Sequence, residues 1–431
     1  MNQAQAIDMS GAPRVPKRIA AVLLNSLKGG VVPRIGLPYV TVGRDVEIKA
    51  LLADLDLIAD GGASFRFLVG RYGAGKSFLL QTIRTHAMGE GFVVADADLS
   101  PERRLQGGQG QGLATYRELV RNLSTKTRPE GGALGLVLDR WVGLCDAEGT
   151  EVPAAGMGGI EEMVHGFDFA RVLRIYRTAS VEGDDATKSA ALRWLRGEYR
   201  TKTEARAELG VSTIIDDDTW YDHLKLLASF LVGAGYRGLL VLIDELVNLY
   251  KIPNAITRQY NYEKILTMYN DTLQGKASHL GIIMGGTPTS IEDRRRGVFS
   301  YEALRSRLAQ GRFAREGMRD MLAPLIHLHP LTYEELLVLI EKLAQIHAGY
   351  HGYATPLTVE NLVSFLTAEF ARVGAETHLT PREVIRDFIE LLDIVYQNPR
   401  ADIDELLGDV GTRAAGAADP AADAPWAEFT L

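Results

Sequence analysis

The stretch Gly70-Arg-Tyr-Gly-Ala-Gly75-Lys76-Ser77 fits the phosphate-binding loop G-x-x-x-x-G-K-[ST] at each fixed position. The apolar run Phe65-Arg-Phe-Leu-Val69 before it predicts a strand, and Phe78-Leu-Leu-Gln-Thr-Ile-Arg84 after it predicts a helix. Glycines let the backbone fold so tightly that several N–H groups point at one phosphate, and the helix N-terminus adds partial positive charge. A glycine turn that merely happens to precede Lys-Ser would lack both flanks. The stretch therefore predicts a nucleoside triphosphate site.

The last two residues of this loop have individual roles. Lys76 is expected to reach the β- and γ-phosphates of ATP, and the Ser77 hydroxyl is expected to ligate Mg²⁺. The residues expected to contact the nucleotide in this segment are Gly70, Arg71, Tyr72, Gly73, Ala74, Gly75, Lys76, Ser77 and Phe78.

A second motif is the aliphatic run Leu239-Leu-Val-Leu-Ile243 followed by Asp244 and Glu245. A buried strand that ends in an aspartate brings a carboxylate to the rim of a sheet, where it would hold Mg²⁺, often through water. Glu245 would then orient and deprotonate the attacking water as a general base. A strand end with two solvated acids has the same appearance, but the presence of the Gly70–Ser77 loop favours ATP hydrolysis.

The composition is that of a globular protein with two or three domains. The chain has 431 residues, 46% of them hydrophobic and 24% charged, and a net charge of −8. No global basic field would attract nucleic acid, so any DNA contact must come from a local patch. The lone cysteine, Cys145, cannot form an intrachain disulfide. With no signal-peptide pattern and no apolar stretch near about 18 residues, we expect a cytoplasmic protein without membrane contact.

Short apolar runs alternate with helical patterns along the chain. This alternation is typical of an α/β fold with a parallel sheet, here of five strands. The expected strands are Ser64–Val69, Phe92–Asp96, Leu239–Ile243, Leu280–Gly285 and Leu325–Leu328. The second and third are much further apart than one crossover helix requires, which predicts a large, mainly helical insertion over residues 99–235.

Capping patterns after the last strand predict a small all-helical C-terminal domain. Thr332 with Glu335 and Thr380 with Glu383 fit capping boxes, and Thr358 fits a helix cap without a box partner. The predicted domains are an N-terminal tail and helix (1–39), a P-loop ATPase domain (40–329), a helical lid (330–400) and a flexible C-terminal tail (401–431). The tail ends in an apolar tip, Trp426–Leu431, for which a docking peptide and a frayed end are alternative interpretations.

Four further residues are candidates for catalysis. Thr287, at the end of the fourth strand, would hold the attacking water, or alternatively cap the turn before Pro288. Arg382 begins a helix of the lid and would close over the phosphates, or alternatively be a plain surface residue. Arg305 and Arg307 precede the fifth strand, where a guanidinium donated to a neighbouring subunit's γ-phosphate would stabilise the transition state.

The two arginines belong to a basic segment. Between Arg294 and Arg319 there are eight arginines and two acidic residues. A catalytic arginine finger, a local DNA or partner patch and a solvated helix face are all compatible with it.

Other conspicuous pairs are interpreted as structural. His327 and His329 lie two apart without a third ligand at metal spacing. Tyr260 and Tyr262 favour packing over stacking on bases.

The order of these motifs resembles that of AAA+ ATPases. Val42-Gly43-Arg44-Asp45-Val-Glu47-Ile48 resembles the Gly-Arg-x-x-Glu box of origin-recognition-type members, which implies that Gly43 and Arg44 lie along the adenine. Longer strings resemble the ATP-binding proteins of bacterial BREX (bacteriophage exclusion) systems, and the length resembles their short, BrxD-like form. These strings are Phe65–Phe78, Gly91–Ser100, Gly235–Tyr250, Tyr301–Leu308 and Leu379–Phe388.

This resemblance implies a sheet ordered 5-1-4-3-2 and a homo-oligomer with shared ATP sites. It also implies defence-system partners such as a helicase, in an antiviral role on or near DNA. The winged-helix domain of many origin-type members has no counterpart in the low-complexity residues after the lid.

Taken with the motifs above, the resemblance predicts an AAA+ ATPase, with a nucleotide-gated scaffold or a DNA-binding loader of little intrinsic hydrolysis as alternatives.

Overall fold

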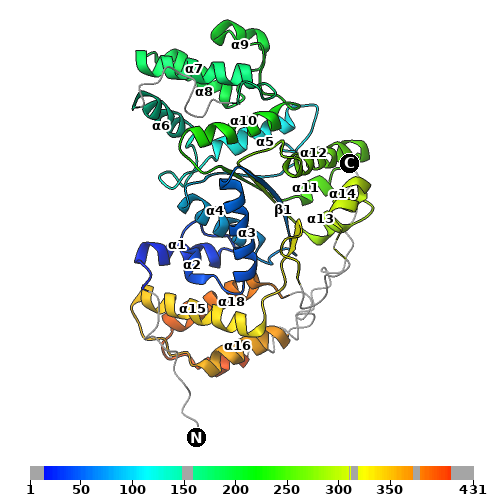
Figure 1. The fold of residues 1–431 in the computed structure, drawn as a ribbon. Helices are drawn as coiled ribbons and strands as arrows, with labels where there is room; N and C mark the ends of the chain where they lie inside the picture. The colour runs from blue at the N-terminus through cyan, green and yellow to red at the C-terminus, as the bar shows by residue number, and fades with distance from the viewer. Residues whose placement is uncertain (1–13, 148–158, 310, 312–318, 372–378, 409–431) are drawn as a thin grey trace, which may run out of the picture. The chain divides into compact units, whose positions relative to one another are not determined.

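Five parallel strands form one sheet in the computed structural model, which describes residues 14–147, 159–309, 311, 319–371 and 379–408 (Figure 1). The strands are β1 (Ala63–Val69), β2 (Val93–Asp98), β3 (Leu239–Asp244), β4 (Leu280–Gly286) and β5 (Leu325–His327). Their order is β2-β3-β4-β1-β5, and each neighbouring pair is parallel. The predicted five-stranded α/β fold is confirmed, as is the strand order that the resemblance implied.

Both faces of the sheet are buried, which explains why its strands are continuous apolar runs. Successive side chains point to opposite faces. Phe67 and Met284 join one core, whereas their neighbours Leu68 and Ile283 join a second core on the other face. The helices that contribute to this second core are α3 (Asp45–Ala59) and α4 (Lys76–Gly89).

A mainly helical insertion separates β2 from β3, as predicted. Its described helices are α5 (Gln111–Arg121), α6 (Leu134–Ala147), α7 (Gly166–Glu182), α8 (Asp185–Leu195), α9 (Lys202–Leu209) and α10 (Trp220–Gly233). The Gly/Pro-rich loop expected near 148–159 lies almost wholly outside the described residues. Between β3 and β5 follow α11 (Val247–Tyr250), α12 (Ala255–Leu273), α13 (Pro288–Glu292), a 3-10 turn (Val298–Ser300) and α14 (Glu302–Leu308).

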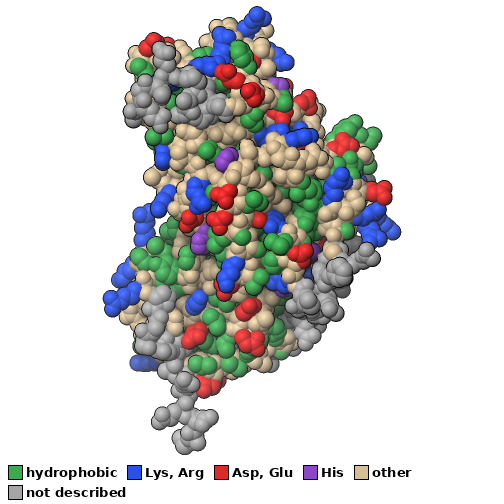
Figure 2. Space-filling model, in the orientation of Figure 1, with side chains coloured by type: hydrophobic (Ala, Val, Ile, Leu, Met, Phe, Trp, Pro, Cys, Tyr) green, Lys and Arg blue, Asp and Glu red, His purple; other side chains and the backbone are tan. Residues whose placement is uncertain are grey.

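Charges of both signs are mixed on the surface. Figure 2 shows Lys and Arg side chains interspersed with Asp and Glu over the face in view. This distribution agrees with the expectation that the chain has no global basic field.

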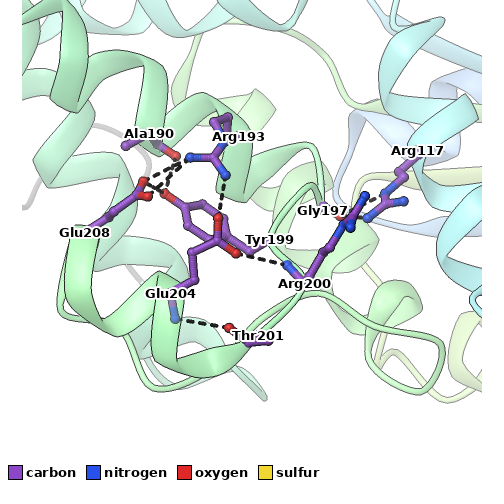
Figure 3. A network of polar contacts seen from close by, with 9 residues as sticks. All are labelled: Arg117, Ala190, Arg193, Gly197, Tyr199, Arg200, Thr201, Glu204 and Glu208. Carbon is purple, nitrogen blue, oxygen red and sulfur yellow. Dashed lines mark hydrogen bonds and ion pairs between the residues drawn. The ribbon is translucent and has the colours of Figure 1, made fainter.

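A polar network joins α8 to α9 in the insertion (Figure 3). The guanidinium of Arg193 donates to Glu204 at 2.7 Å and to Glu208 at 3.1 Å. Its carbon lies 4.6 Å from the centre of the Tyr199 ring, and the Tyr199 hydroxyl donates to Glu208. Burial and the Glu208 carboxylate raise the pKa of Tyr199, so this phenol stays protonated and keeps donating. The network thus links two helices that follow each other along the chain.

The helices at the two ends of the chain share a separate core. They are α1 (Lys17–Lys28), α2 (Leu37–Val40), α15 (Tyr333–His351), α16 (Val359–Ala371) and α18 (Pro381–Gln397). The capping boxes predicted at Thr332 and Thr380 are both present. The prediction that Thr358 has no box partner was wrong. The side-chain oxygen of Asn361 accepts from the Thr358 N–H, and the Asn361 backbone N–H donates to the Thr358 hydroxyl.

Contacts between residues divide the chain into two compact units. One contains the sheet and the insertion, over Val46–Arg71 and Leu79–Leu328. The other comprises Met1–Asp45, Tyr72–Phe78 and His329–Leu431, so the N-terminal helices and most of the glycine-rich loop group with the helical domain. The predicted division into a 40–329 ATPase domain and a 330–400 lid stays a prediction. The apolar tip Trp426–Leu431 lies outside the described residues. No described helix has the length and apolar character needed to cross a membrane.

Candidate nucleotide-binding site

The carboxyl ends of three strands meet at one edge of the sheet. β1 leads directly into Gly70, whose N–H donates to the Gly286 carbonyl at the end of β4 over 3.1 Å. β4 in turn lies beside β3, which ends at Asp244. The start of the glycine-rich loop and the acidic strand end are therefore separated by a single strand. This arrangement follows from the strand order that the resemblance implied.

The Asp244 carboxylate is held by the residues around it. Its Oδ1 accepts the Glu245 N–H at 2.8 Å. A Cβ added at Gly285 would lie 2.2 Å from the same oxygen, so only glycine leaves room for the carboxylate there. The sequence analysis overlooked Gly285, whose signal was the pair of glycines that ends an otherwise aliphatic strand.

The backbone at Glu245 adopts an unusual conformation. Its φ is +63°, in the left-handed region that residues other than glycine rarely occupy. The turn is fixed by the next residue, because the Leu246 N–H donates to the Gly285 carbonyl at 3.1 Å. Such strain costs about 1–3 kcal/mol and is concentrated at functional sites. It therefore favours a functional rather than a merely structural role for this glutamate.

Asp98 adds a third carboxylate at this edge. It is paired in register with Asp244 across β2 and β3. Desolvation by the surrounding protein, followed by the negative charges of Asp244 and Glu245, raises its pKa. The sequence analysis ended this strand at Asp96 and so overlooked Asp98, although the alternation in Asp96-Ala97-Asp98 was its signal.

Two glycines shape the loop itself. Gly73 and Gly75 have φ values of +78° and +95°, which only glycine adopts without strain. At Gly73 an added Cβ would also lie 2.8 Å from the hydroxyl oxygen of Thr380, the cap of α18. Gly73 occupies a variable position of the motif, so its requirement for glycine comes from its positive φ and from the contact with the cap of α18.

Arg44 is bonded to the loop backbone. Its guanidinium donates to the Ala74 carbonyl at 3.1 Å and to the His329 carbonyl at 3.0 Å, and only 5% of the residue is exposed. Gly43 before it has a φ of +67°, and an added Cβ would lie 2.5 Å from the Glu335 carboxyl group. The described bonds give Arg44 a positioning role for the loop. Contact of Gly43 and Arg44 with adenine stays a prediction.

Arg382 lies against the loop as well. Its guanidinium carbon is 4.8 Å from the centre of the Tyr72 ring, a cation–π contact. Tyr72 itself is 69% exposed. Arg382 of the helical domain, which the sequence predicted to act at the phosphates, thus contacts the phosphate-binding loop through Tyr72. The sequence did not predict this contact with Tyr72.

Thr287 forms the cap that was its alternative interpretation. Its hydroxyl accepts the Ser290 N–H, and the Ser290 hydroxyl is 2.9 Å from the Thr287 N–H, which completes a capping box for α13. Thr287 follows directly after β4, at the sheet edge that carries Asp244 and Gly70. Its catalytic role stays a prediction.

The basic segment is largely engaged in local contacts. Arg305 is 3.5 Å from Glu302, and Arg307 donates to the Ala303 carbonyl at 2.8 Å, both within α14. Arg319 pairs with Glu47 at 2.6 Å. Arg296 donates to the Ile252 carbonyl at 3.4 Å. Arg294 and Arg295 are exposed, and Arg312 and Arg315 lie outside the described residues.

The residues interpreted as structural have the following surroundings. His327 Nε2 is 2.7 Å from Glu292. Tyr262 is buried and donates to the Arg296 carbonyl, which confirms packing, whereas Tyr260 is 53% exposed. Cys145 is buried at the end of α6.

The parallel sheet and the glycine-rich loop after β1 define an α/β protein of the P-loop class. The sequence profile of the BREX system ATP-binding proteins BrxC/D matches residues 15–410. The chain belongs to this family of ATP-binding proteins, as the resemblance indicated. No curated protein matched the chain.

Proposed function

We propose that this protein hydrolyses ATP with Mg²⁺ and couples its nucleotide state to assembly with other proteins of a bacterial anti-phage defence system. Membership of a BREX ATP-binding family supports the ATP and defence parts of this proposal. The observation that carries the hydrolysis part is the sheet edge, where one strand separates the start of the glycine-rich loop from Asp244 and Glu245.

The residues of this edge fit a magnesium ion. Mg²⁺ prefers oxygen ligands: the Asp244 carboxylate is one at this edge, and the Ser77 hydroxyl of the glycine-rich loop is the second ligand that its motif predicts. Burial first, and then the negative charges of Asp244 and Glu245, raise the pKa of Asp98 beside them. When bound, Mg²⁺ would supply positive charge beside the β- and γ-phosphates.

The hydrolytic roles follow from the side-chain chemistry. Lys76 binds the β- and γ-phosphates, while N–H groups of the loop surround them. Glu245 takes a proton from water, whose oxygen attacks the γ-phosphorus, and the bond to the ADP oxygen breaks. Arg382 and an arginine of a neighbouring subunit, Arg305 or Arg307, stabilise the charge that spreads over the transferring group. Thr287 orients the water.

The proposed location, oligomeric state and partners of the protein rest on its family and on its exposed arginines. We propose a cytoplasmic homo-oligomer with defence partners such as a helicase. DNA would contact the exposed guanidinium groups of Arg294 and Arg295. The alternative is a nucleotide-gated scaffold with little hydrolysis. It would bind ATP through the same loop, but Glu245 would then have no role as a general base.

ATP binding and turnover, measured separately, test the proposal. Lys76→Ala should abolish tight ATP binding, whereas Glu245→Gln should bind ATP normally and turn over about 100-fold more slowly or worse. The exposed Lys276→Ala and Glu162→Gln serve as matched controls and should behave as the unmodified protein.

Both measurements are made with and without double-stranded DNA. Unchanged turnover in Glu245→Gln would refute its role as the base. Tight binding with negligible turnover in the unmodified protein, DNA present or absent, would support the scaffold alternative.

A further inference from the structure

Three metal-ligand side chains meet inside the helical domain, remote in sequence from the nucleotide motifs. They are His347 and His351 on α15 and Asp393 on α18, and one ligand atom of each lies within 4.8 Å of the others. No other group of three or more such residues with this spacing occurs among the described residues. None of the three takes part in the proposed ATP chemistry.

The helix geometry explains why the two imidazoles meet. Residues four apart lie one turn apart on the same helix face. The helix ends directly after His351, at the left-handed cap Gly352. The His351 ring is further confined by Tyr396 of α18, whose ring centre is 4.2 Å away. The pair therefore faces α18, which carries the carboxylate.

His347 has the hydrogen-bonding environment of a metal ligand. Only 1% of it is exposed, and its Nε2 is 3.1 Å from Asp393 Oδ1. Its Nδ1 is 3.0 Å from the Tyr353 hydroxyl. A hydroxyl both donates and accepts, so it satisfies Nδ1 when Nε2 carries the proton and also when Nε2 offers its lone pair. Partners of this kind orient the histidines that bind metals.

Asp393 uses its two oxygens differently. Oδ1 faces His347, and Oδ2 accepts from the Lys28 ammonium at 2.6 Å. The lysine is partly exposed and sits on α1, so it can withdraw into solvent. The carboxylate thus retains one oxygen that points toward the two imidazoles.

We propose that His347, His351 and Asp393 bind one divalent transition-metal ion, with Zn²⁺ as the best match. Two imidazoles and a carboxylate are zinc ligands, whereas Mg²⁺ rarely binds imidazole. Tetrahedral Zn²⁺ with bonds of about 2.0–2.1 Å places its ligand atoms about 3.4 Å apart. The His347–Asp393 distance is already shorter than this. The His351 ligand atom lies within 4.8 Å of the other two, so a shift of up to about 1.4 Å would bring it to this spacing, and water completes the coordination.

The expected consequence is a metal bridge between α15 and α18, which pack on one core. A ligand that binds only the folded state stabilises that state. The bridge would therefore stiffen the domain whose α18 carries Arg382 and is capped by Thr380. Because the metal ligands are distinct from the P-loop residues, metal binding should be independent of ATP binding.

The test uses the full chain without a histidine tag, stripped with EDTA. Co²⁺ is added as a spectroscopic probe, and Zn²⁺ affinity is measured by competition with a chromophoric chelator. We expect one equivalent of Zn²⁺ per chain and visible Co²⁺ absorption from a four- or five-coordinate site. His351→Gln and Asp393→Asn should each weaken Zn²⁺ binding about 100-fold or more, because one of three ligands is lost.

The matched control is His86→Gln, which removes an exposed histidine from α4 and should bind Zn²⁺ like the unmodified chain. Melting in EDTA shows whether each variant is folded, and Lys76→Ala should still bind Zn²⁺. Excess Mg²⁺ should not displace the metal. The proposal is wrong if the unmodified chain binds no stoichiometric Zn²⁺. It is equally wrong if folded His351→Gln and Asp393→Asn both bind with unchanged affinity.

Discussion

Gly285 determines where the Asp244 carboxylate lies, since a Cβ there would approach Oδ1 to 2.2 Å. Gly285→Ala should therefore displace the carboxylate and lower ATP turnover at limiting Mg²⁺ about tenfold or more, because the metal ligand is misplaced. Higher Mg²⁺ concentrations should recover part of the loss. Turnover against Mg²⁺ concentration measures the effect.

The neighbouring glycine provides the control for this variant. A Cβ added at Gly286 would lie 2.8 Å from Ile291 Cδ1 and 3.0 Å from Ser290 Oγ, and Asp244 is not among its nearest contacts. Gly286→Ala should thus retain its Mg²⁺ dependence. Equal Mg²⁺ dependence in both variants would show that the space beside Asp244 does not govern metal binding.

Some residues of the site can be predicted from the sequence because their spacing is fixed by local backbone geometry. The positions of Gly70, Asp244 and Glu245 relative to the strands are of this kind. Gly285 and the Tyr72–Arg382 contact are not, because each depends on how closely two distant segments approach. Neither the catalytic role of Thr287 nor the contact of Arg44 with adenine is tested by the structure.

At the scale of elements, one ion pair joins α3, β1 and the segment before β5. Arg66 donates to both oxygens of Asp54, at 2.6 and 2.7 Å, and to the carbonyls of Leu322 and Ala323 at 2.7 Å. The arginine is 8% exposed. Arg66→Met should lower the free energy of unfolding by about 3–5 kcal/mol, because it leaves a nearly buried carboxylate without its counter-charge and with only the Ser64 hydroxyl as a donor. Chemical denaturation followed by circular dichroism measures this change.

A surface pair serves as the comparison for Arg66. Arg121 pairs with Glu118 at 2.7 Å, but 73% of its side chain is exposed. Arg121→Ala should change the free energy of unfolding by less than about 1 kcal/mol. A similarly small loss for Arg66→Met would mean that packing, rather than the ion pair, holds α3 on the sheet.

All five strands were predictable from their apolar runs, whereas their ends were not. β2 and β3 each end in an acidic residue, because the last residue of a strand, next to a loop, can carry a charge that a buried residue in the middle of the strand cannot. The capping boxes at Thr332 and Thr380 follow from local spacing alone. The box at Thr358 was missed because Asn361 supplies the reciprocal bond that glutamate or glutamine usually supplies.

At the scale of the whole molecule, a buried histidine links stability to pH. His223 on α10 is fully buried, its Nδ1 is 2.9 Å from the Thr219 carbonyl, and its Nε2 has no hydrogen-bond partner among the described residues. Burial, with a smaller effect of nearby His165, lowers its pKa from 6.5 to about 4. Between these values the unfolded state binds a proton that the folded state does not.

The contribution of the neutral His223 ring to the free energy of unfolding should be fully present above pH 6.5 and should decrease as the pH falls toward 4. The expected loss is about 3 kcal/mol, at about 1.4 kcal/mol per pKa unit. Melting temperatures from pH 7 to 4.5 measure it. His223→Phe should flatten this part of the profile, whereas the exposed His86→Gln should not. An equally steep profile in His223→Phe would assign the effect to other groups.

Shared active sites would make turnover depend on assembly. ATP turnover per chain should rise with protein concentration, and loss of the true finger among Arg305 and Arg307 should lower it about 1,000-fold without loss of ATP binding. Mixing that variant with Glu245→Gln should restore part of the activity, because one variant supplies the base and the other the arginine. Arg295→Ala is the control. No recovery on mixing would argue against an arginine donated between subunits.

The strand order also has a consequence for how the chain is made. β1 pairs with β4 and β5, and β2 pairs with β3, so the first two strands to leave the ribosome are not neighbours. At about 5–20 residues per second, residues 99–238 take roughly 7–30 s to translate, and β3 is not complete until they have been added. During that interval the apolar segments of β1 and β2 have no neighbouring strand with which to form backbone hydrogen bonds. The yield of folded protein should therefore depend on chaperones that cover nascent apolar segments.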